Sequence, residues 1–90
     1  MSEPATRGSH SRVNVLRKAD ELLELLARDG ELTITELAER AGEPRSSVYR
    51  LVATLEELDF AAPGRRPGAY QLGLQLYRYG RFSQVSAPAP

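Results

Sequence analysis

Two short helical patterns meet at a tight Gly-Glu-Pro corner between residues 37 and 58 (LAERAGEPRSSVYRLVATLEEL), and this pairing constrains the fold more than any other feature. Apolar residues recur at helical spacing on both sides of the corner, so each helix can bury one face. Pro44 is tolerated in the first turn of the second helix, where no intrahelical donor is needed. The first apolar face consists of Ile34, Leu37, Ala38 and Ala41, and the second consists of Val48, Leu51, Val52, Leu55 and Leu58.

The side of the second helix that faces away from this core is polar. Hydrogen-bond donors and small side chains there would form a rod that fits the major groove of duplex DNA. Two helices joined by such a tight turn are typical of a helix-turn-helix. The outward-facing residues are Arg45, Ser46, Tyr49, Arg50 and Ala53.

Local signals define the helices before the corner. Asn14 can cap a helix that runs to Asp29, and Gly30 can end it in the left-handed conformation. Thr33 and Glu36 match a capping box at the start of the next helix. The apolar stripe of the first helix is wide for so small a domain, which leaves room for part of it to pack on a second copy. That stripe consists of Val15, Leu16, Ala19, Leu22, Leu23, Leu26 and Ala27.

After the second helix of the corner, the helical period gives way to short alternating segments. Residues 60–62 and 69–72 predict two antiparallel strands, and the loop between them carries Arg65 and Arg66. Gly73 breaks the second strand, and a short apolar helix follows. The fold class is therefore mainly α with a small β-hairpin, a winged helix-turn-helix with a three-helix core, a two-stranded wing and a C-terminal helix. The expected divisions are a disordered arm (1–12), the winged domain (13–73), and a helix start with a disordered tail (74–90).

The charge distribution favours a nucleic-acid partner, although the formal net charge is zero. Residues 20–43 hold eight acidic side chains against two basic ones, whereas residues 60–90 hold four arginines and no acid. Basic residues also outnumber acids before residue 20. An acidic back and a basic front would orient the domain on DNA.

The chain lacks the residue combinations that enzyme catalysis requires. The chain has no cysteine, a single histidine (His10), no metal-ligand spacing and no glycine-rich phosphate loop. We therefore expect no enzyme activity, no cofactor and no metal. No apolar run approaches the roughly 20 residues that cross a bilayer, and the first residues lack the apolar centre of a signal peptide. We expect a cytoplasmic protein with no membrane partner.

Taken together, these segments resemble the DNA-binding domain of the isocitrate lyase regulator (IclR) family of bacterial transcription factors. The resemblance covers residues 13–80 and rests on LRKADELLELLA, LTITELAERAGEPRSSVYRLVATLEEL and AYQLGLQLYRYG. Its most discriminating part is the aromatic-x-Leu-Gly sequence directly after the wing. One departure is Asp59, which stands where the family commonly has glycine at the start of the wing, so the geometry of that corner is left open.

The resemblance implies features that the residues alone do not show. Such regulators are usually much longer and carry a C-terminal domain that binds a small-molecule effector, for which this chain has no counterpart. The helix from residue 74 would be the start of the linker helix between the two domains. Family members bind DNA as dimers or tetramers, usually as repressors and sometimes as activators. We expect the operator of this chain to be palindromic. The residues expected at the dimer interface are Leu16, Leu23, Leu74 and Tyr77.

The predicted DNA contacts lie mainly at the start of the second helix of the corner. Arg45 and Arg50 are candidates for bidentate contact to guanine or for clamping a phosphate. Ser46 and Ser47 lie near the positive end of the helix dipole, where donors meet phosphates or base edges. Tyr49 can reach a phosphate or a thymine methyl, and the resemblance agrees at Ser47, Tyr49 and Arg50. The full predicted set is Arg45, Ser46, Ser47, Tyr49, Arg50, Thr33, Arg65 and Arg66.

Each assignment has a structural alternative. Ser47 could serve helix initiation alone, and Arg50 could pair with a neighbour on its own helix. Arg65 and Arg66 could lie in a solvated loop instead of contacting the DNA backbone or minor groove. For the whole domain, the alternative is a winged helix that binds another protein and no DNA. Salt-dependent binding to duplex DNA would separate these two functions.

Overall fold

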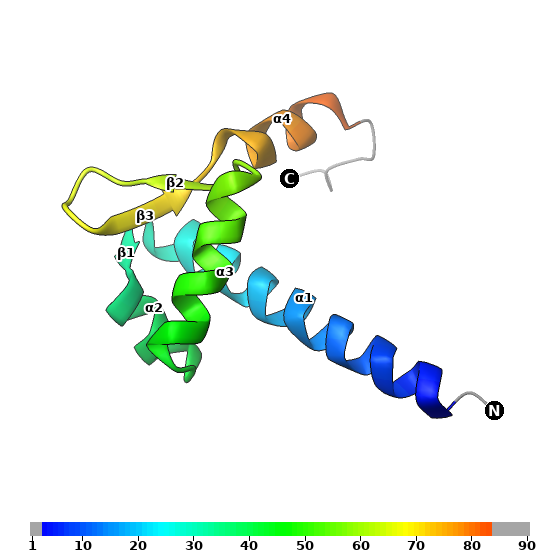
Figure 1. Cartoon of the computed structure of the whole chain (residues 1–90). Helices are drawn as coiled ribbons and strands as arrows, with labels where there is room; N and C mark the ends of the chain where they lie inside the picture. The colour runs from blue at the N-terminus through cyan, green and yellow to red at the C-terminus, as the bar shows by residue number, and fades with distance from the viewer. Residues whose placement is uncertain (1–2, 84–90) are drawn as a thin grey trace.

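The computed structural model describes the backbone of residues 3–83 and the side chains of residues 14–83. A long first helix extends away from the body, and the other elements gather around its C-terminal half (Figure 1). The tail predicted beyond Ser83 lies outside the described residues. The elements in chain order are α1 (Glu3–Asp29), β1 (Leu32–Thr33), α2 (Ile34–Ala41), α3 (Arg45–Glu57), β2 (Ala61–Pro63), β3 (Ala69–Leu72) and α4 (Leu74–Phe82).

Helix α1 begins at Glu3, eleven residues before the Asn14 that was predicted as its N-cap. That predicted start is wrong because a good capping residue favours a helix start without forcing one. Pro4 lies in the first turn, where a proline is tolerated, and no other proline interrupts the helix. The backbone of residues 3–12 is therefore helical where a disordered arm was expected. Gly30 ends α1 as predicted, with a φ of 88°.

The helical pair α2–α3 follows the predicted local signals closely. The Thr33 hydroxyl accepts from the Glu36 amide at 3.1 Å, and the Thr33 amide donates to the Glu36 carboxylate at 2.9 Å, which confirms the capping box. Gly42 ends α2 in the left-handed conformation, with a φ of 69°. Pro44 is the N-cap of α3, one position earlier than a first-turn proline. Two residues thus separate the left-handed end of α2 from the start of α3.

The sheet has three antiparallel strands in the order β1-β3-β2. The two-stranded wing is confirmed as β2 and β3, and β1 is a third strand that the sequence analysis missed. Strand β1 pairs with β3 through Leu32 opposite Tyr70, and β2 pairs with β3 through Ala61 opposite Leu72. Two residues are too few to show the alternation by which a strand is recognised in a sequence. Because β1 directly precedes α2, it ties the base of the wing to the helical pair.

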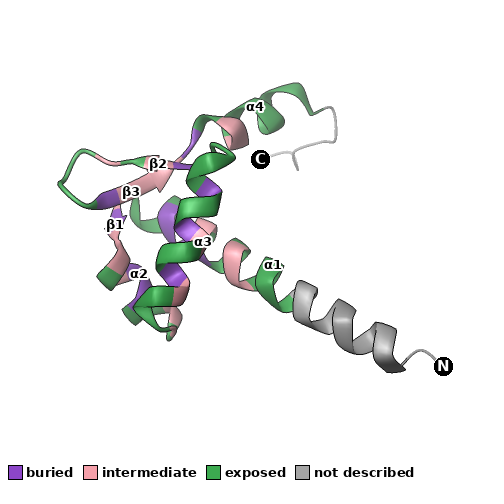
Figure 2. Cartoon of the chain, in the orientation of Figure 1, coloured by how far each residue is buried: buried purple, intermediate pink, exposed green. Residues whose placement is uncertain are grey.

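The core lies where α1, α2 and α3 meet (Figure 2). Leu58 was predicted on the buried face of α3 but is 52% exposed, because α3 ends at Glu57 and Leu58 leaves the helical stripe. Val15 and Leu16 of the predicted α1 stripe are exposed, whereas Leu25, outside that stripe, is buried. The largest fully buried side chains are Leu22, Leu26, Leu37, Val48 and Val52.

The corner between α3 and the wing meets the corner between the wing and α4. Asp59 has a φ of 64°, the left-handed region in which glycine is most easily accommodated. Its carbonyl accepts from the amide of Gln75, and the carbonyl of Phe60 accepts from the amide of Gly73 at 2.8 Å. A Cβ on Gly73 would overlap the Asp59 carbonyl oxygen and lie 2.9 Å from the Ala61 nitrogen. The glycine of the aromatic-x-Leu-Gly sequence is therefore needed for this close approach.

Candidate nucleic-acid interface

The first two turns of α3 present a polar surface to solvent. Arg45, Ser46, Tyr49 and Arg50 are exposed, and Tyr49 is 61% exposed despite its large ring. Among the described residues, the side chains of Ser46, Tyr49 and Arg50 form no hydrogen bond or ion pair. The opposite face of the same helix is held in the core by Val48, Val52 and Leu55. The predicted outward face is thus confirmed, and its side chains are available to a ligand.

A shallow groove runs from the start of α2 onto this face. It is lined by both helices, and Thr35 stands at its α2 side. The guanidinium of Arg45 donates to the Thr35 hydroxyl at 3.4 Å across the groove. Thr35 was missed by the sequence analysis, although its place two residues after the capping Thr33 puts it on the first turn of α2. The residues lining the groove are Ile34, Thr35, Arg45, Ser46, Tyr49 and Arg50.

A second hollow lies on the other side of Arg50, between α3 and α1. Ser47 is half-buried there beside Lys18, which forms an ion pair with Glu43 at 3.3 Å. Arg50 lines both hollows. Among the described residues, Arg50 makes no hydrogen bond or ion pair with a neighbour on its own helix, which was the structural alternative for this residue. Lys18 is a further basic group on this side that the sequence analysis did not select.

Thr33 occupies a different place from the other predicted contacts. It is half-buried, and its hydroxyl oxygen is the acceptor of the α2 capping box. Its partner Glu36 also accepts from Arg66 of the wing at 3.1 Å. These bonds from the Thr33 amide and Arg66 hold the pKa of the Glu36 carboxyl below its usual range. The structure therefore uses Thr33 to start α2, and its predicted contact with DNA stays a prediction.

The two arginines of the wing loop differ sharply. The backbone amides of Arg65 and Arg66 donate to the carboxylate of Glu31 at 2.8 and 3.1 Å. The Arg66 guanidinium also donates to the main-chain oxygen of Glu31 at 3.1 Å, whereas the exposed Arg65 side chain forms no hydrogen bond or ion pair within the described part of the chain. The two amide bonds are the main reason why the pKa of Glu31 lies below its usual range.

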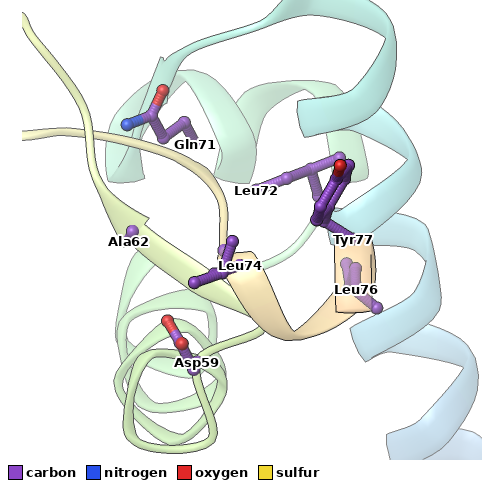
Figure 3. A pocket seen from close by; sticks show the side chains of 8 residues that line it. Asp59, Ala62, Gln71, Leu72, Leu74, Leu76 and Tyr77 are labelled. Atoms are coloured by element: carbon purple, nitrogen blue, oxygen red, sulfur yellow. The ribbon is translucent and has the colours of Figure 1, made fainter. Parts of the chain in front are cut away.

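The residues predicted at a dimer interface fall into two separate apolar hollows. Leu16 and Leu23 lie between α1 and the second half of α3, beside Leu58 and Phe60. Leu74 and Tyr77 of α4 line a hollow against the wing strands (Figure 3). Leu16, Leu74 and Tyr77 are more than half exposed, and Leu23 is half-buried. Both hollows are open in the part of the chain that the structure describes, and the interface assigned to them stays a prediction.

Comparison with known proteins identifies the family to which this arrangement belongs. The family model of the IclR helix-turn-helix domain matches residues 15–63, which run from α1 through the helical pair to the end of β2. The chain belongs to the IclR helix-turn-helix family. That family consists of transcriptional regulator domains and not of enzymes. The match ends before the wing loop, so Arg65, Arg66 and Gly73 lie outside it.

Curated relatives support the same assignment. The chain is 39% identical over 65 residues to the HTH-type transcriptional regulator KipR of Bacillus subtilis, and the matched segment covers 72% of this chain and 26% of KipR. It is 31% identical over 77 residues to the transcriptional repressor IclR of Escherichia coli, covering 84% of this chain and 28% of that protein. The chain therefore spans little more than a quarter of the length of these relatives.

Solved structures share the fold. An IclR-type transcriptional regulator from Alicyclobacillus acidocaldarius superposes with a TM-score of 0.71 at 33% identity, covering 76% of this chain and 28% of that one. A Zα domain from Carassius auratus PKZ, solved in complex with Z-DNA, has a TM-score of 0.61 at 17% identity and covers 66% and 97% of the two chains. At that identity the second likeness concerns the winged-helix fold alone.

Proposed function

We propose that this domain binds duplex DNA sequence-specifically as the DNA-binding part of a transcriptional regulator that acts as a repressor. The observation that carries the proposal is the exposed face of α3. Its arginines, serine and tyrosine project from a helix whose opposite face is buried in the core, and most of these side chains have no partner among the described residues. A helix of this kind at the end of a tight turn fits the major groove.

We assign the exposed side chains of α2 and α3 to base edges or to phosphates according to their position. Arg50 and Tyr49 lie farthest along the exposed face and are assigned to base edges, where a bidentate arginine selects guanine. Arg45 and Thr35 lie together at the junction of α2 and α3 and are assigned to phosphate, which fixes register but carries no sequence information. Ser46 and Ser47 add donors near the amides of the first α3 turn.

Assembly follows from the two open apolar hollows. We assign Leu16, Leu23, Leu74 and Tyr77 to contacts between copies, in a dimer or tetramer that reads a palindromic operator. Response to a small-molecule effector would come from a domain outside these 90 residues, because relatives of this chain are several times longer. Action on chromosomal DNA places the protein in the bacterial cytoplasm. Within the described residues, no helix combines the length and hydropathy needed to cross a membrane.

The test is selection of binding sites from a pool of random duplex DNA by the purified chain at two salt concentrations. We expect an enriched palindrome whose half-sites lie about one helical turn apart, with affinity that falls steeply as salt rises. The matched control is the double variant Arg45→Ala/Arg50→Ala, which should enrich nothing. Retention of DNA without any enriched sequence would reject the sequence-specific function, and no salt-dependent retention at all would favour the protein-binding alternative.

A further inference from the structure

The wing loop is folded around a carboxylate of the protein itself. Two successive amides, those of Arg65 and Arg66, converge on the two oxygens of Glu31. The loop approaches so closely that a Cβ on Gly64 would lie 2.8 Å from the carboxyl carbon of Glu31. Successive backbone amides of this kind form a concavity that binds an anion. Here Glu31, 34 residues away in the sequence, occupies it and fixes the backbone of the loop.

Arg66 completes this attachment with its side chain. Its guanidinium donates to the Glu31 main-chain oxygen and to the Glu36 carboxylate, both at 3.1 Å. Both bonds are donated by Nη2, so a phosphate that engaged this nitrogen would have to displace both acceptors. Because Glu36 is also the capping-box partner of Thr33, the same contact connects the wing to the first turn of α2. The wing and the helical pair are thereby joined by charged groups.

Arg65 is in the opposite situation. Its amide is held by Glu31, while its side chain is exposed and has no hydrogen bond or ion pair among the described residues. Ordering a long side chain on binding has an entropic cost, and that cost is smaller when the backbone that carries it is already fixed. A loop held in this way presents one arginine to a ligand and retains the other.

We propose that Glu31 is a positioning residue for DNA binding, which holds the wing loop so that Arg65 contacts a DNA phosphate while Arg66 serves as an internal strut. This inference rests on the proposed function, because it assigns roles on the same DNA-binding surface. It divides the two wing arginines, which the sequence analysis treated alike. It also gives Glu31, an acidic residue that would repel DNA as a free charge, a role that favours binding.

The first experiment compares Arg65→Ala with Arg66→Ala on the selected operator over a series of salt concentrations. A lost phosphate contact reduces the slope of log affinity against log salt by about 1. We expect that reduction for Arg65→Ala only, whereas Arg66→Ala should weaken binding with the slope unchanged. A reduced slope for Arg66→Ala with an unchanged slope for Arg65→Ala would overturn the proposal.

The second experiment uses Glu31→Gln, with Glu24→Gln on the exposed surface of α1 as the control that removes the same charge. We expect Glu31→Gln to bind about fivefold more weakly than the control, which corresponds to the net contribution of about one hydrogen bond. The amides of residues 65 and 66 should also exchange with solvent faster in the free protein. Tighter binding by Glu31→Gln than by the control would show that Glu31 competes with DNA for the arginines, and would overturn the proposal.

These experiments separate this inference from the proposed function. If the unaltered chain binds no duplex DNA, the proposed function fails first, and the role of Glu31 in DNA binding fails with it. If the unaltered chain binds and the two arginine variants behave alike, only the division of roles within the wing fails. Arg65→Ala removes an exposed side chain without a partner, so its folding is not at issue.

Discussion

The helical pair α2–α3 and the wing reach their geometry by different routes. In the pair, the backbone and capping contacts join residues three to five apart, such as the capping box of Thr33 with Glu36 and the bond from the Gly42 amide to Ala38. The ion pair of Lys18 with Glu43 also joins this turn to α1. In the wing, the fixing contacts join distant segments. The amide of Arg65 reaches Glu31, 34 residues away, and Gly73 packs against the backbone of Asp59.

This difference determines which side chains remain for a ligand. Local backbone contacts and a buried apolar face are enough to hold α3. The side chains of Tyr49 and Arg50 on its exposed side therefore make no hydrogen bond or ion pair with the rest of the described chain. The wing has little core of its own and is held by side-chain contacts, so Arg66 is bound to Glu31, just before β1, and to Glu36 of α2. Under the proposed function, Arg50, which has no side-chain partner among the described residues, is therefore a better candidate for DNA contact than Arg66.

The largest effect should come from Gly73→Ala, which attacks a long-range contact of the wing. The new Cβ would lie 2.7 Å from the Asp59 carbonyl carbon and closer still to its oxygen, and backbone cannot move aside as a flexible side chain can. We expect the free energy of unfolding to fall by about 3 kcal/mol, the upper part of the usual range for overpacking. Chemical denaturation of the purified variant measures this change.

Gly80→Ala is the matched control, because a Cβ at Gly80 in α4 meets nothing within 4 Å. Alanine is the better helix former by roughly 1 kcal/mol, so this variant should be no less stable than the unaltered chain. An equal loss of stability in both variants would mean that the Gly73 contact does not matter and that the wing needs no long-range anchor at its base.

The same contrast explains how much of the molecule could be predicted from the sequence. The capping box, the glycine ends of α1 and α2, and the exposed face of α3 were predicted because each depends on residues within about one or two helical turns. Strand β1 was not predicted, because two residues are too few to show an alternating apolar pattern and the pairing of β1 with β3 is set by tertiary structure. The different side-chain contacts of Arg65 and Arg66 could not be predicted either, because these adjacent identical residues differ only in their contacts with the distant Glu31 and Glu36.

An intermediate effect is expected for Arg50→Ala, which tests the independence of the helical pair. Arg50 is exposed and has no side-chain partner among the described residues, so its removal should leave the free energy of unfolding within about 0.5 kcal/mol. Binding to the selected operator should weaken by roughly 1 to 3 kcal/mol, as for loss of a bidentate base contact. Titration at fixed salt measures the binding.

Arg28→Ala removes an equal charge from the last turn of α1, which lines neither hollow beside Arg50. It should bind operator nearly as well as the unaltered chain. Equal losses in the two variants would reduce the role of Arg50 to general charge, and an unfolded Arg50→Ala variant would show that the exposed face of α3 has a structural role after all.

The smallest effect should come from Asp59→Gly, which sharpens the comparison at the corner where α3 passes into the wing. Asp59 has a φ of 64°, where a side chain other than glycine is strained, and its charge lies just beyond the C-terminus of α3, where the helix dipole disfavours an anion. Glycine relieves both effects but gives the unfolded chain more freedom, which offsets about 0.4 to 1 kcal/mol of the gain. We therefore expect a net stabilisation of roughly 0.5 kcal/mol, within the range of gains for relieving local strain. Asp59→Asn is the control, because asparagine has backbone preferences similar to those of aspartate in the left-handed region and removes only the charge. If denaturation gives the same gain for both variants, the charge alone is responsible; a gain for glycine alone assigns the strain to the backbone, and destabilisation by glycine would mean that Asp59 suits this corner better than the family's usual residue does.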